Sequence, residues 1–243
     1  HGTVHNGGLI KTTDGPGIKI SGERFVQSES EDVIDEPEFE EKPELPQLQL
    51  AALVEIEEPE EDGYGPAIRS NGADITIETT GDIDILDGVI SARDNVTGEG
   101  GNVKMNNSGV FYSREEETLR TNGEGKIDVR QNAGGEIQNA IDAIHNVGSG
   151  RNTVTVGPGT FYESIEMDHK NLSLFGYNKG IDGFDDANRK PETVIMSDEY
   201  GILVTANHSI IDGLYIDSST LDKEATGGRG DDGIRLENVR GSK

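Results

Sequence analysis

The chain has 243 residues, with 47 acidic and 21 basic side chains and a formal net charge of −26 at pH 7, so we expect neither nucleic acid nor an anionic membrane surface as a partner. Cysteine is absent, which excludes a disulfide framework, a thiolate metal site and a cysteine nucleophile. No apolar stretch approaches the roughly 20 residues that a membrane-spanning helix needs, so membrane insertion is not expected.

Short strands are predicted near the N-terminus. Residues 7–22 read GGLIKTTDGPGIKISG, in which small groups of apolar residues stand between glycine-containing turns. Glycine is the residue that turns with positive φ angles accept most readily. We therefore expect two strands here, each only a few residues long.

Residues 29–62 form an acidic excursion from this pattern. They contain 15 Asp and Glu, one basic residue (Lys42) and four prolines, so they carry −14 of the net charge of −26. High charge density together with proline opposes a packed element. The apolar centre of the segment, residues 48–56, is nevertheless predicted to be able to return to the core as a strand.

Residues 72–113 show the strand pattern most clearly. Ile75 and Ile77, and then Ile83 and Ile85, alternate with polar residues, and residues 100–113 repeat the theme. Alternation with a period of two, bounded by Gly, Asn or Asp, is typical of short strands with one buried face. We interpret residues 1–122 as a first structural unit, with a boundary in the polar segment 114–125.

A helix interrupts the strands near residues 136–146. Ile137, Ala140, Ile141, Ile144 and Val147 form one apolar stripe with helical spacing, which predicts a short amphipathic helix. A stack of strands has an open end where its core meets water, and a helix laid over that end would cover both the core and the strand edges. We therefore interpret residues 123–243 as a second unit that opens with a capping helix.

Strands this short and closely spaced predict an all-β, parallel solenoid. In such a fold each turn of the chain, roughly 20 to 25 residues long, adds two or three strands to long parallel sheets. An up-and-down barrel is the competing architecture, but it requires longer strands and two-residue hairpin turns.

Two segments resemble known families of right-handed parallel β-helix proteins. Residues 124–198 resemble the opening of pectin methylesterases and pectin-lyase-like proteins, through the series Ile137–Gln138–Ala140–Ile141–Ala143, Pro158–Gly159–Phe161–Tyr162–Glu163 and Asn171–Leu172–Leu174–Gly176. The resemblance implies a right-handed β-helix that starts with a helix. The family's catalytic Asp and Arg motifs do not occur in this chain, so the resemblance extends to the scaffold and not to the esterase activity.

The first unit resembles a different group. Within residues 1–113, the positions Ile75, Ile77, Thr80, Gly81, Ile83, Ile85, Gly88, Ile90 and Ala92 match the repeats of filamentous-haemagglutinin-type exoproteins and related adhesins. Those proteins are secreted, very long, and structural or adhesive. The resemblance therefore implies a second right-handed β-helix, joined in tandem to the other, and an extracellular location at the cell surface.

Several acidic residues are candidate ligands for Ca²⁺, because this cation prefers carboxylate and carbonyl oxygens. One group lies within seven residues and the other is a pair near the C-terminus; together they are Asp182, Asp185, Asp186, Asn188, Asp231 and Asp232. A solvated turn is the alternative interpretation for both groups. Calcium is the only cofactor that the sequence suggests.

Aromatic residues suggest a glycan-binding surface. Tyr162, Tyr177 and Tyr215 are the candidates in the second unit, because aromatic rings combine an apolar face with a polar edge. A glycosidase that uses Asp212 with Asp231 and Asp232 is the enzymatic alternative. Four acceptor sites for N-glycosylation begin at Asn95, Asn106, Asn171 and Asn207.

These observations lead to one leading hypothesis and one alternative. The leading hypothesis is a non-enzymatic, structural segment of an extracellular β-solenoid surface, adhesin or filament protein. Its expected partners are a continuation of the same chain or other copies stacked end to end. The alternative is a pectinase-like, carbohydrate-active β-helix enzyme or a glycan-binding module.

Overall fold

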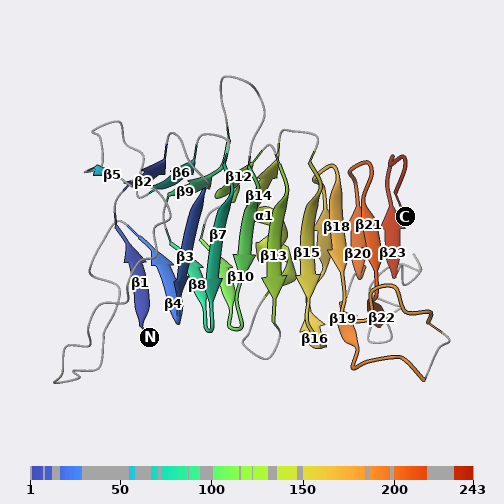
Figure 1. Ribbon diagram of the computed structural model, residues 1–243. Coiled ribbons are helices and arrows are strands. Elements are labelled where there is room, and N and C mark those ends of the chain that lie inside the picture. The colour runs from blue at the N-terminus through green and yellow to red at the C-terminus, as the bar shows by residue number, and fades with distance from the viewer. Residues whose placement is uncertain are drawn as a thin grey trace.

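A computed structural model describes the chain over residues 2–7, 9–12, 17–28, 55–57, 67–70, 73–86, 88–93, 101–114, 116–121, 123–130, 136–146, 150–183, 187–197, 200–217 and 233–242. Over these residues the protein consists mostly of short strands in parallel sheets, together with a single helix. The strands lie side by side along one long axis, from the N-terminal strands at one end to the C-terminal strands at the other (Figure 1).

The strands form five sheets, in which neighbouring strands are distant in sequence. Sheet A contains β1 (Thr3–Asn6), β4 (Arg24–Gln27), β8 (Ile83–Ile85) and β11 (Phe111–Ser113). Sheet B contains β5 (Glu55–Glu57), β2 (Leu9–Thr12), β6 (Ala67–Ser70), β9 (Val89–Ser91), β12 (Leu119–Thr121) and β14 (Ile144–Asn146). Sheet C contains β3 (Ile18–Gly22), β7 (Ile75–Thr79), β10 (Val103–Asn106), β13 (Gly125–Val129), β15 (Asn152–Val156), β18 (Leu172–Phe175) and β21 (Ile210–Asp212).

Two smaller sheets complete the C-terminal part. Sheet E contains β16 (Gly159–Tyr162), β19 (Thr193–Met196) and β22 (Tyr215–Asp217), and sheet F contains β17 (Ile165–Met167), β20 (Ile202–Val204) and β23 (Ile234–Leu236). Within each sheet of the described residues, neighbouring strands are parallel, with one exception. The exception is β5, which lies at the end of the acidic segment 29–62 and pairs antiparallel with β2.

The chain visits the sheets in a repeating order. Four times it passes through sheets A, B and C in turn; then α1 (Ile137–Asp142) takes the position of a sheet A strand, and later passes run through E, F and C. We call one such pass a circuit. Because each strand pairs with its counterparts in the preceding and following circuits, equivalent residues stack in rows along the molecule.

The core consists of inward-facing rows of apolar side chains. The longest row in sheet C crosses all seven strands and consists of Ile20, Ile77, Met105, Ile127, Val154, Leu174 and Ile211. A parallel row in sheet B pairs Ile68, Ile90 and Leu119, and all three are fully buried. The period-two alternation in the sequence follows from this arrangement, because successive residues of a strand point to opposite faces.

The helix α1 packs its apolar stripe into the same core. Ile137, Ala140 and Ile141 are fully buried, and the helix contacts β11 of sheet A on one side and β17 of sheet F on the other. The predicted helix is therefore present. It is shorter than residues 136–146, because Ile144 leaves the helical stripe and pairs with Leu119 as part of β14.

Polar side chains of α1 satisfy the edges of the strands on either side. Asn139 accepts a hydrogen bond from the Ser113 N–H at 2.9 Å and donates one to the Ser113 carbonyl at 2.7 Å. Gln138 accepts from the Glu166 N–H at 2.8 Å and donates to the Glu166 carbonyl at 3.3 Å. A side-chain amide, like a peptide group, offers both a donor and an acceptor, so the helix replaces a strand without leaving these backbone groups unpaired.

The helix therefore lies between two sets of strands. It covers the edge of sheet A at β11, as an end cap would, but further circuits follow on its other side. The strand β13, which follows the predicted boundary, pairs with β10 before it and β15 after it. The polar segment 114–125 contains β12, whose Leu119 is fully buried. The division into two units near residue 122 stays a prediction, and sheet C is continuous across that position.

The acidic segment returns to the core at β5, as its sequence suggested. The strand spans Glu55–Glu57 and therefore overlaps the end of the predicted range 48–56, while residues 48–54 lie outside the described part of the chain. Its partner β2 is otherwise the N-terminal edge of the parallel part of sheet B. An exposed edge can pair with other strands, and β5 blocks this edge.

Candidate functional site

The best-defined polar site surrounds sheet E and the loop that precedes β19. The outward-facing residues of sheet E form two rows: Thr160, Val194 and Tyr215 in one, and Tyr162, Met196 and Asp217 in the other. The inward face holds Phe161 and Ile195, both buried. The alternation along β16 and β22 therefore directs the tyrosines outward, toward solvent.

The three predicted tyrosines all lie in this region. The side chain of Tyr162 is 79% exposed, that of Tyr215 is 50% exposed and that of Tyr177 is 42% exposed. Tyr177 belongs to the loop 176–192, and its N–H donates to the Thr193 hydroxyl at 2.9 Å. Because Thr193 is in β19 between the strands of the other two tyrosines, this bond attaches the loop to the same sheet.

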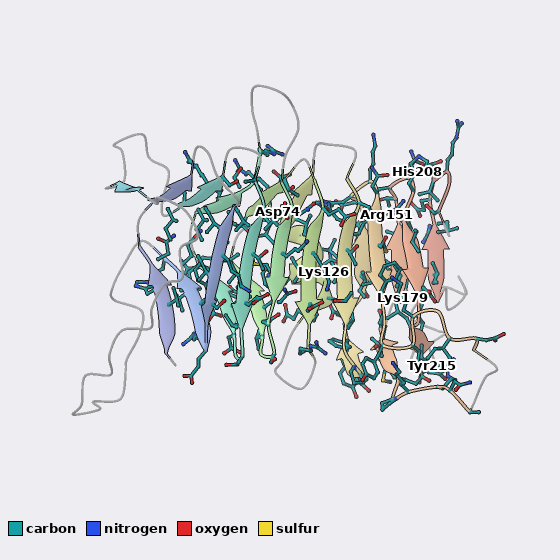
Figure 2. The ribbon with its side chains drawn as sticks, in the orientation of Figure 1. Asp74, Lys126, Arg151, Lys179, His208 and Tyr215 are labelled. Atoms are coloured by element: carbon teal, nitrogen blue, oxygen red, sulfur yellow. The ribbon has the colours of Figure 1, made fainter. Side chains whose placement is uncertain are left out.

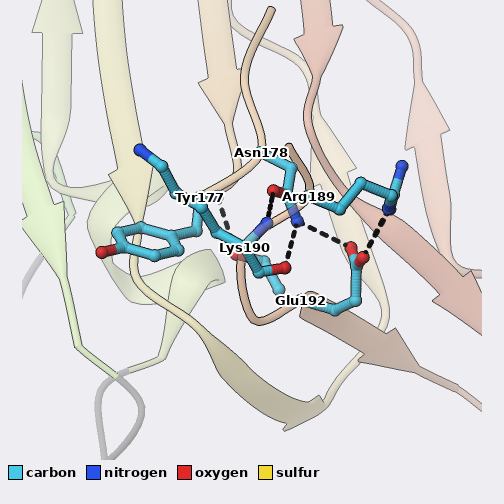
Figure 3. A network of polar contacts seen from close by, with 6 residues as sticks. Tyr177, Asn178, Arg189, Lys190 and Glu192 are labelled. Atoms are coloured by element: carbon cyan, nitrogen blue, oxygen red, sulfur yellow. Dashed lines mark hydrogen bonds and ion pairs between the residues drawn. The ribbon is translucent and has the colours of Figure 1, made fainter. Parts of the chain in front are cut away.

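The loop 176–192 is closed by a network around Asn178 (Figure 3). The Asn178 amide accepts from the Lys190 N–H at 2.7 Å and donates to the Lys190 carbonyl and to Glu192, each at 3.0 Å. The other oxygen of Glu192 receives Arg189 Nε at 2.8 Å and Nη2 at 2.6 Å. These contacts join the two ends of the loop, so the loop is held without a strand of its own.

Two lysines of the loop lie over aromatic rings. Lys179 Nζ is 3.4 Å from the centroid of the Phe175 ring, and Lys190 Nζ is 5.2 Å from that of the Tyr177 ring. Both distances are within the range of a cation–π interaction. Lys179 and Tyr215 lie at the same end of the molecule (Figure 2). The region therefore offers exposed aromatic rings and ammonium groups for recognition.

Glycines allow the loop to start close to the next circuit. A Cβ atom at Gly176 would lie 2.1 Å from the carbonyl oxygen of Gly213, and Gly213 itself has a φ of +76°. The N–H of Gly180 donates to Asp212 at 3.0 Å. Asp212, a candidate acid of a glycosidase, thus has a structural contact, while its proposed partners Asp231 and Asp232 lie outside the described residues.

The candidate calcium ligands are described only in part. Asp182 and Asn188 are exposed residues of the loop 176–192, whereas Asp185 and Asp186, like the pair near the C-terminus, fall outside the described residues. Within the described part of the chain, no three His, Asp or Glu side chains are grouped as a metal site requires. The calcium site stays a prediction from the sequence.

The glycosylation candidates occupy different environments. Asn106 is the last residue of β10, and Asn171 lies at a turn with a φ of 60°. Asn207 accepts a hydrogen bond from the Arg240 N–H at 2.6 Å. Asn95 lies outside the described residues. The contact of Asn207 gives that side chain a role within the fold, because it bridges two circuits.

Burial shifts the pKa of two carboxyl groups beside α1. Desolvation raises the pKa of Glu163, although its two oxygens accept the N–H groups of Ile137 and Gln138, each at 2.9 Å. Desolvation also raises the pKa of Asp142, which accepts a hydrogen bond from Gln138 at 2.6 Å. Glu163 binds the N-terminal end of α1 from outside the helix, whereas Asp142 is bonded to Gln138 within it.

The sequence suggested the tyrosines but not the network beside them. Asn178 and Glu192 are separated by 14 positions and lie outside any recognisable motif, so their contact follows only from the path of the loop. The available signal was the accumulation of Lys, Arg and Asn between two predicted strands. In comparisons with protein-family models, curated proteins and solved structures, nothing matches the chain.

The described helix is far too short to span a membrane, and none of the described residues forms a longer apolar helix.

Proposed function

We propose that the chain is a structural segment of a right-handed parallel β-helix, which forms part of an extracellular surface protein, adhesin or filament. The repeating order of the strands supports this role, because each circuit buries its apolar residues on the preceding circuit. Such a scaffold lengthens by the addition of circuits and needs no catalytic centre. The high density of negative charge suits a surface exposed to salt water.

The observation that carries the proposal is the exposure of β23. In sheet F, Ile234 stacks on Ile202 and Leu236 stacks on Val204. Ile202 and Val204 are fully buried, whereas Ile234 is 46% exposed and Leu236 is 59% exposed. The side chains of Ile234 and Leu236 continue the inward-facing rows of sheet F, but no further strand of the described residues covers them.

A further layer on β23 would be favourable for two reasons. It would remove apolar side chains from water, at about 25 cal/mol for each Å² buried. It would also pair the backbone groups of β23 that now form a sheet edge. Either a following circuit of the same chain or a second copy has the repeating geometry that fits this surface. Both would make the segment part of a longer stack.

Charged substitutions at β23 test this proposal. The masses of the wild-type chain and of Leu236→Lys would be measured by sedimentation over a wide range of concentrations. We expect the wild type to associate in a concentration-dependent manner and Leu236→Lys to stay monomeric. Tyr112→Lys is the matched control, because Tyr112 is another large exposed side chain (41%) on β11, away from this end.

Two results would contradict the structural role. The first is a wild-type chain that is monomeric at every concentration and gains no stability when circuits are added after β23. In that case the exposed side chains of β23 are not a contact surface. Equal association of the wild type and Leu236→Lys would place the contact elsewhere.

A second candidate function, glycan binding, is favoured by one observation. Tyr162 and Tyr215 face outward from the same sheet, and the backbone N–H of Tyr177, whose side chain is also exposed, donates to Thr193 of that sheet. Aromatic faces of this kind stack on sugar rings, and the neighbouring lysines can donate to hydroxyl groups. A glycan array with the wild type, Tyr162→Ala and Tyr112→Ala tests this function. A binding signal that only Tyr162→Ala loses would support it, and the same signal from all three would not.

A further inference from the structure

The strand β23 leaves one edge of sheet F open. Its partner β20 lies on one side, and no described strand lies on the other. The carbonyl of Gly233 accepts a hydrogen bond from β20 at 3.0 Å, and the N–H of Glu237 donates one to β20 at 2.9 Å. Because successive residues of a strand direct their N–H and C=O groups to opposite sides, those of Ile234 and Leu236 point to the open edge. These two residues can therefore bind a further strand.

The side chains along this edge form a self-complementary pattern. Ile234 and Leu236 continue the inward-facing rows of sheet F, whereas Arg235 and Glu237 lie on the other face. In an antiparallel pair of two β23 strands centred on Arg235, Ile234 of each copy lies opposite Leu236 of the other. A two-fold axis through Arg235 thus brings the same apolar residues together twice, as an isologous interface requires.

The charges on the outer face are compatible with this register. Arg235 and Glu237 of one chain approach to 2.6 Å, with side chains 45% and 41% exposed. In the antiparallel pair the two Arg235 side chains lie opposite each other, and Glu237 of each copy is a diagonal neighbour of Arg235 of the other, within reach of long side chains. The arginines and glutamates around the axis balance, although the whole chain has a net charge of −26.

The N-terminal end of the molecule is a poorer match for β23. The edge strand β1 of sheet A directs Val4 and Asn6 inward, and Asn6 is buried and donates to Gln27 at 3.3 Å. A parallel pair of β23 with β1 matches one apolar residue of β23 with Val4 and leaves the other opposite Asn6 or Gly2, depending on the register. Antiparallel pairs are also slightly more stable per residue than parallel ones. The better partner for β23 is therefore another β23.

We propose that β23 binds β23 of a second copy of the chain, antiparallel and centred on Arg235, so that sheet F continues from one molecule into the other. This pairing rests on the contact surface proposed above for β23 and names its occupant. Because the two-fold axis is perpendicular to the sheet, the inward faces of both copies lie on the same side. Ile234 and Leu236 then form one apolar surface across a closed dimer, in which two stacks are joined end to end.

Cysteine cross-linking tests the register, because the chain has no cysteine of its own. In the proposed pair the two Cα atoms of residue 235 lie about 4.5 Å apart, as in other antiparallel pairs without direct hydrogen bonds. This separation suits a disulfide, so mild oxidation should convert Arg235→Cys into a covalent dimer.

Leu203→Cys is the matched control for the cross-linking. Leu203 is the register partner of Arg235 on β20, one strand away from the edge. In the proposed dimer its two copies lie three strand spacings apart, or about 14 Å, which is too far for a disulfide. We therefore expect Arg235→Cys to yield at least about tenfold more covalent dimer than Leu203→Cys.

Charge reversal tests the same contact without a covalent bond. Arg235→Glu surrounds the axis with carboxylates and should weaken dimerisation at least about tenfold, because like charges in neighbouring cross-strand positions repel. The double variant Arg235→Glu/Glu237→Arg exchanges the two charges and should regain most of the loss. Lys104→Glu is the control for net charge, because Lys104 lies on β10 of sheet C. Sedimentation equilibrium in about 0.15 M salt, which screens the net charge, measures all four chains.

The outcomes separate the pairing from the contact surface itself. Covalent dimers of Arg235→Cys, together with recovery in the double variant, support the pairing. Equal cross-linking of the two cysteine variants, or wild-type association that Arg235→Glu leaves unchanged, would overturn it. If Leu236→Lys abolishes association while Arg235→Cys gives no covalent dimer, β23 is a contact surface but its antiparallel partner is wrong. A wild type that is monomeric at every concentration would overturn both.

Discussion

The two parts of the molecule on either side of α1 share sheet C but differ in the other sheets that they contain. Sheet C runs through both parts, whereas sheets A and B belong to the N-terminal part and sheets E and F to the C-terminal part. A change of sheets in a stack of strands would normally leave two rows of unpaired backbone groups. Asn139 and Gln138 supply the missing partners, one on each side of the helix. The comparison indicates that α1 is a joint between two sets of strands, rather than a cap at an end.

The two ends of the molecule differ in a related manner. At the N-terminal end, β5 covers the edge of sheet B in antiparallel orientation, so that edge cannot accept another parallel strand. At the C-terminal end, β23 presents Ile234 and Leu236 to solvent. Among the described strands, β1 and β3 are still edge strands of sheets A and C at the N-terminal end, so the edge that β5 covers is that of sheet B.

The largest expected effect tests whether the two parts are one cooperative unit. Ile127 is fully buried in the row of sheet C that both parts share. Ile127→Ala should lower the free energy of unfolding by about 2 to 5 kcal/mol, through lost burial and the cavity left behind. Because sheet C crosses α1, strands on both sides should lose hydrogen-exchange protection together.

A partner variant gives the comparison its control. Phe111 is almost fully buried in β11 of sheet A, which ends at the helix. Phe111→Leu should act more strongly on the N-terminal strands than on β20 and β23. If Ile127→Ala affected one side of α1 alone, the two parts would be separate units.

The second prediction separates the two sides of the joint. Asn139→Ala removes the hydrogen bonds to the N–H and carbonyl of Ser113, and Ser113 is only 2% exposed. Each buried group without a partner costs about 1 to 3 kcal/mol. Gln138→Ala should cost less, because water can reach Glu166, which is exposed. Urea unfolding of both variants measures the difference, and a larger effect for Gln138→Ala would reverse the interpretation of the joint.

The third prediction concerns the pH dependence of the joint. The pKa of Glu163 is raised in the folded state, mainly by desolvation, above the value of about 4.3 that a glutamate has in an unfolded chain. Between these two pKa values the folded chain binds more protons than the unfolded chain. The contribution of Glu163 to stability therefore increases as the pH falls through its folded pKa, and decreases as the pH rises.

Glu163→Gln isolates this contribution, because glutamine does not titrate. Near neutral pH the variant should lose about 1 kcal/mol, since one amide oxygen replaces two acceptors for the N–H groups of Ile137 and Gln138. The stability difference between the wild type and the variant should grow as the pH falls from neutral toward the unfolded pKa of about 4.3. Asp142 is present in both chains, so its own titration largely cancels. A difference that shrinks at lower pH would contradict the raised pKa.

Local sequence patterns predicted the strands well, for a physical reason. The alternation of Ile75 and Ile77, and of Ile83 and Ile85, is imposed by one buried face, so it can be read without knowledge of the partners. The apolar stripe of Ile137, Ala140 and Ile141 likewise predicted α1. The predicted C-terminal end of the helix was wrong, because Ile144 belongs to β14, which pairs with β12, although its spacing fits the helical stripe.

Long-range arrangement was less accessible to sequence reasoning. Gln138 and Asn139 of α1 bind strand edges about 26 to 28 positions away, which the helical spacing of the sequence does not predict. The Asn178–Glu192 contact depends on the path of the loop 176–192 and not on a local pattern. The tyrosines were predicted because a single exposed aromatic residue is visible by itself.

The smallest expected effects compare surface ion pairs of the two parts. Lys19 and Glu78 approach to 2.8 Å on sheet C, with side chains 56% and 42% exposed. Arg189 and Glu192 approach to 2.6 Å with side chains 21% and 29% exposed, and Glu192 also binds Asn178. Exposed pairs contribute about 0.2 to 1 kcal/mol, because water and salt screen the charges and two long side chains lose freedom. Lys19→Ala should therefore change the free energy of unfolding by less than about 0.5 kcal/mol, and Arg189→Ala should cost more because it loosens the loop network. Thermal unfolding in low and high salt measures both. A larger loss of unfolding free energy for Lys19→Ala than for Arg189→Ala would contradict this order. It would mean that surface ion pairs stabilise sheet C more than they stabilise the loop 176–192.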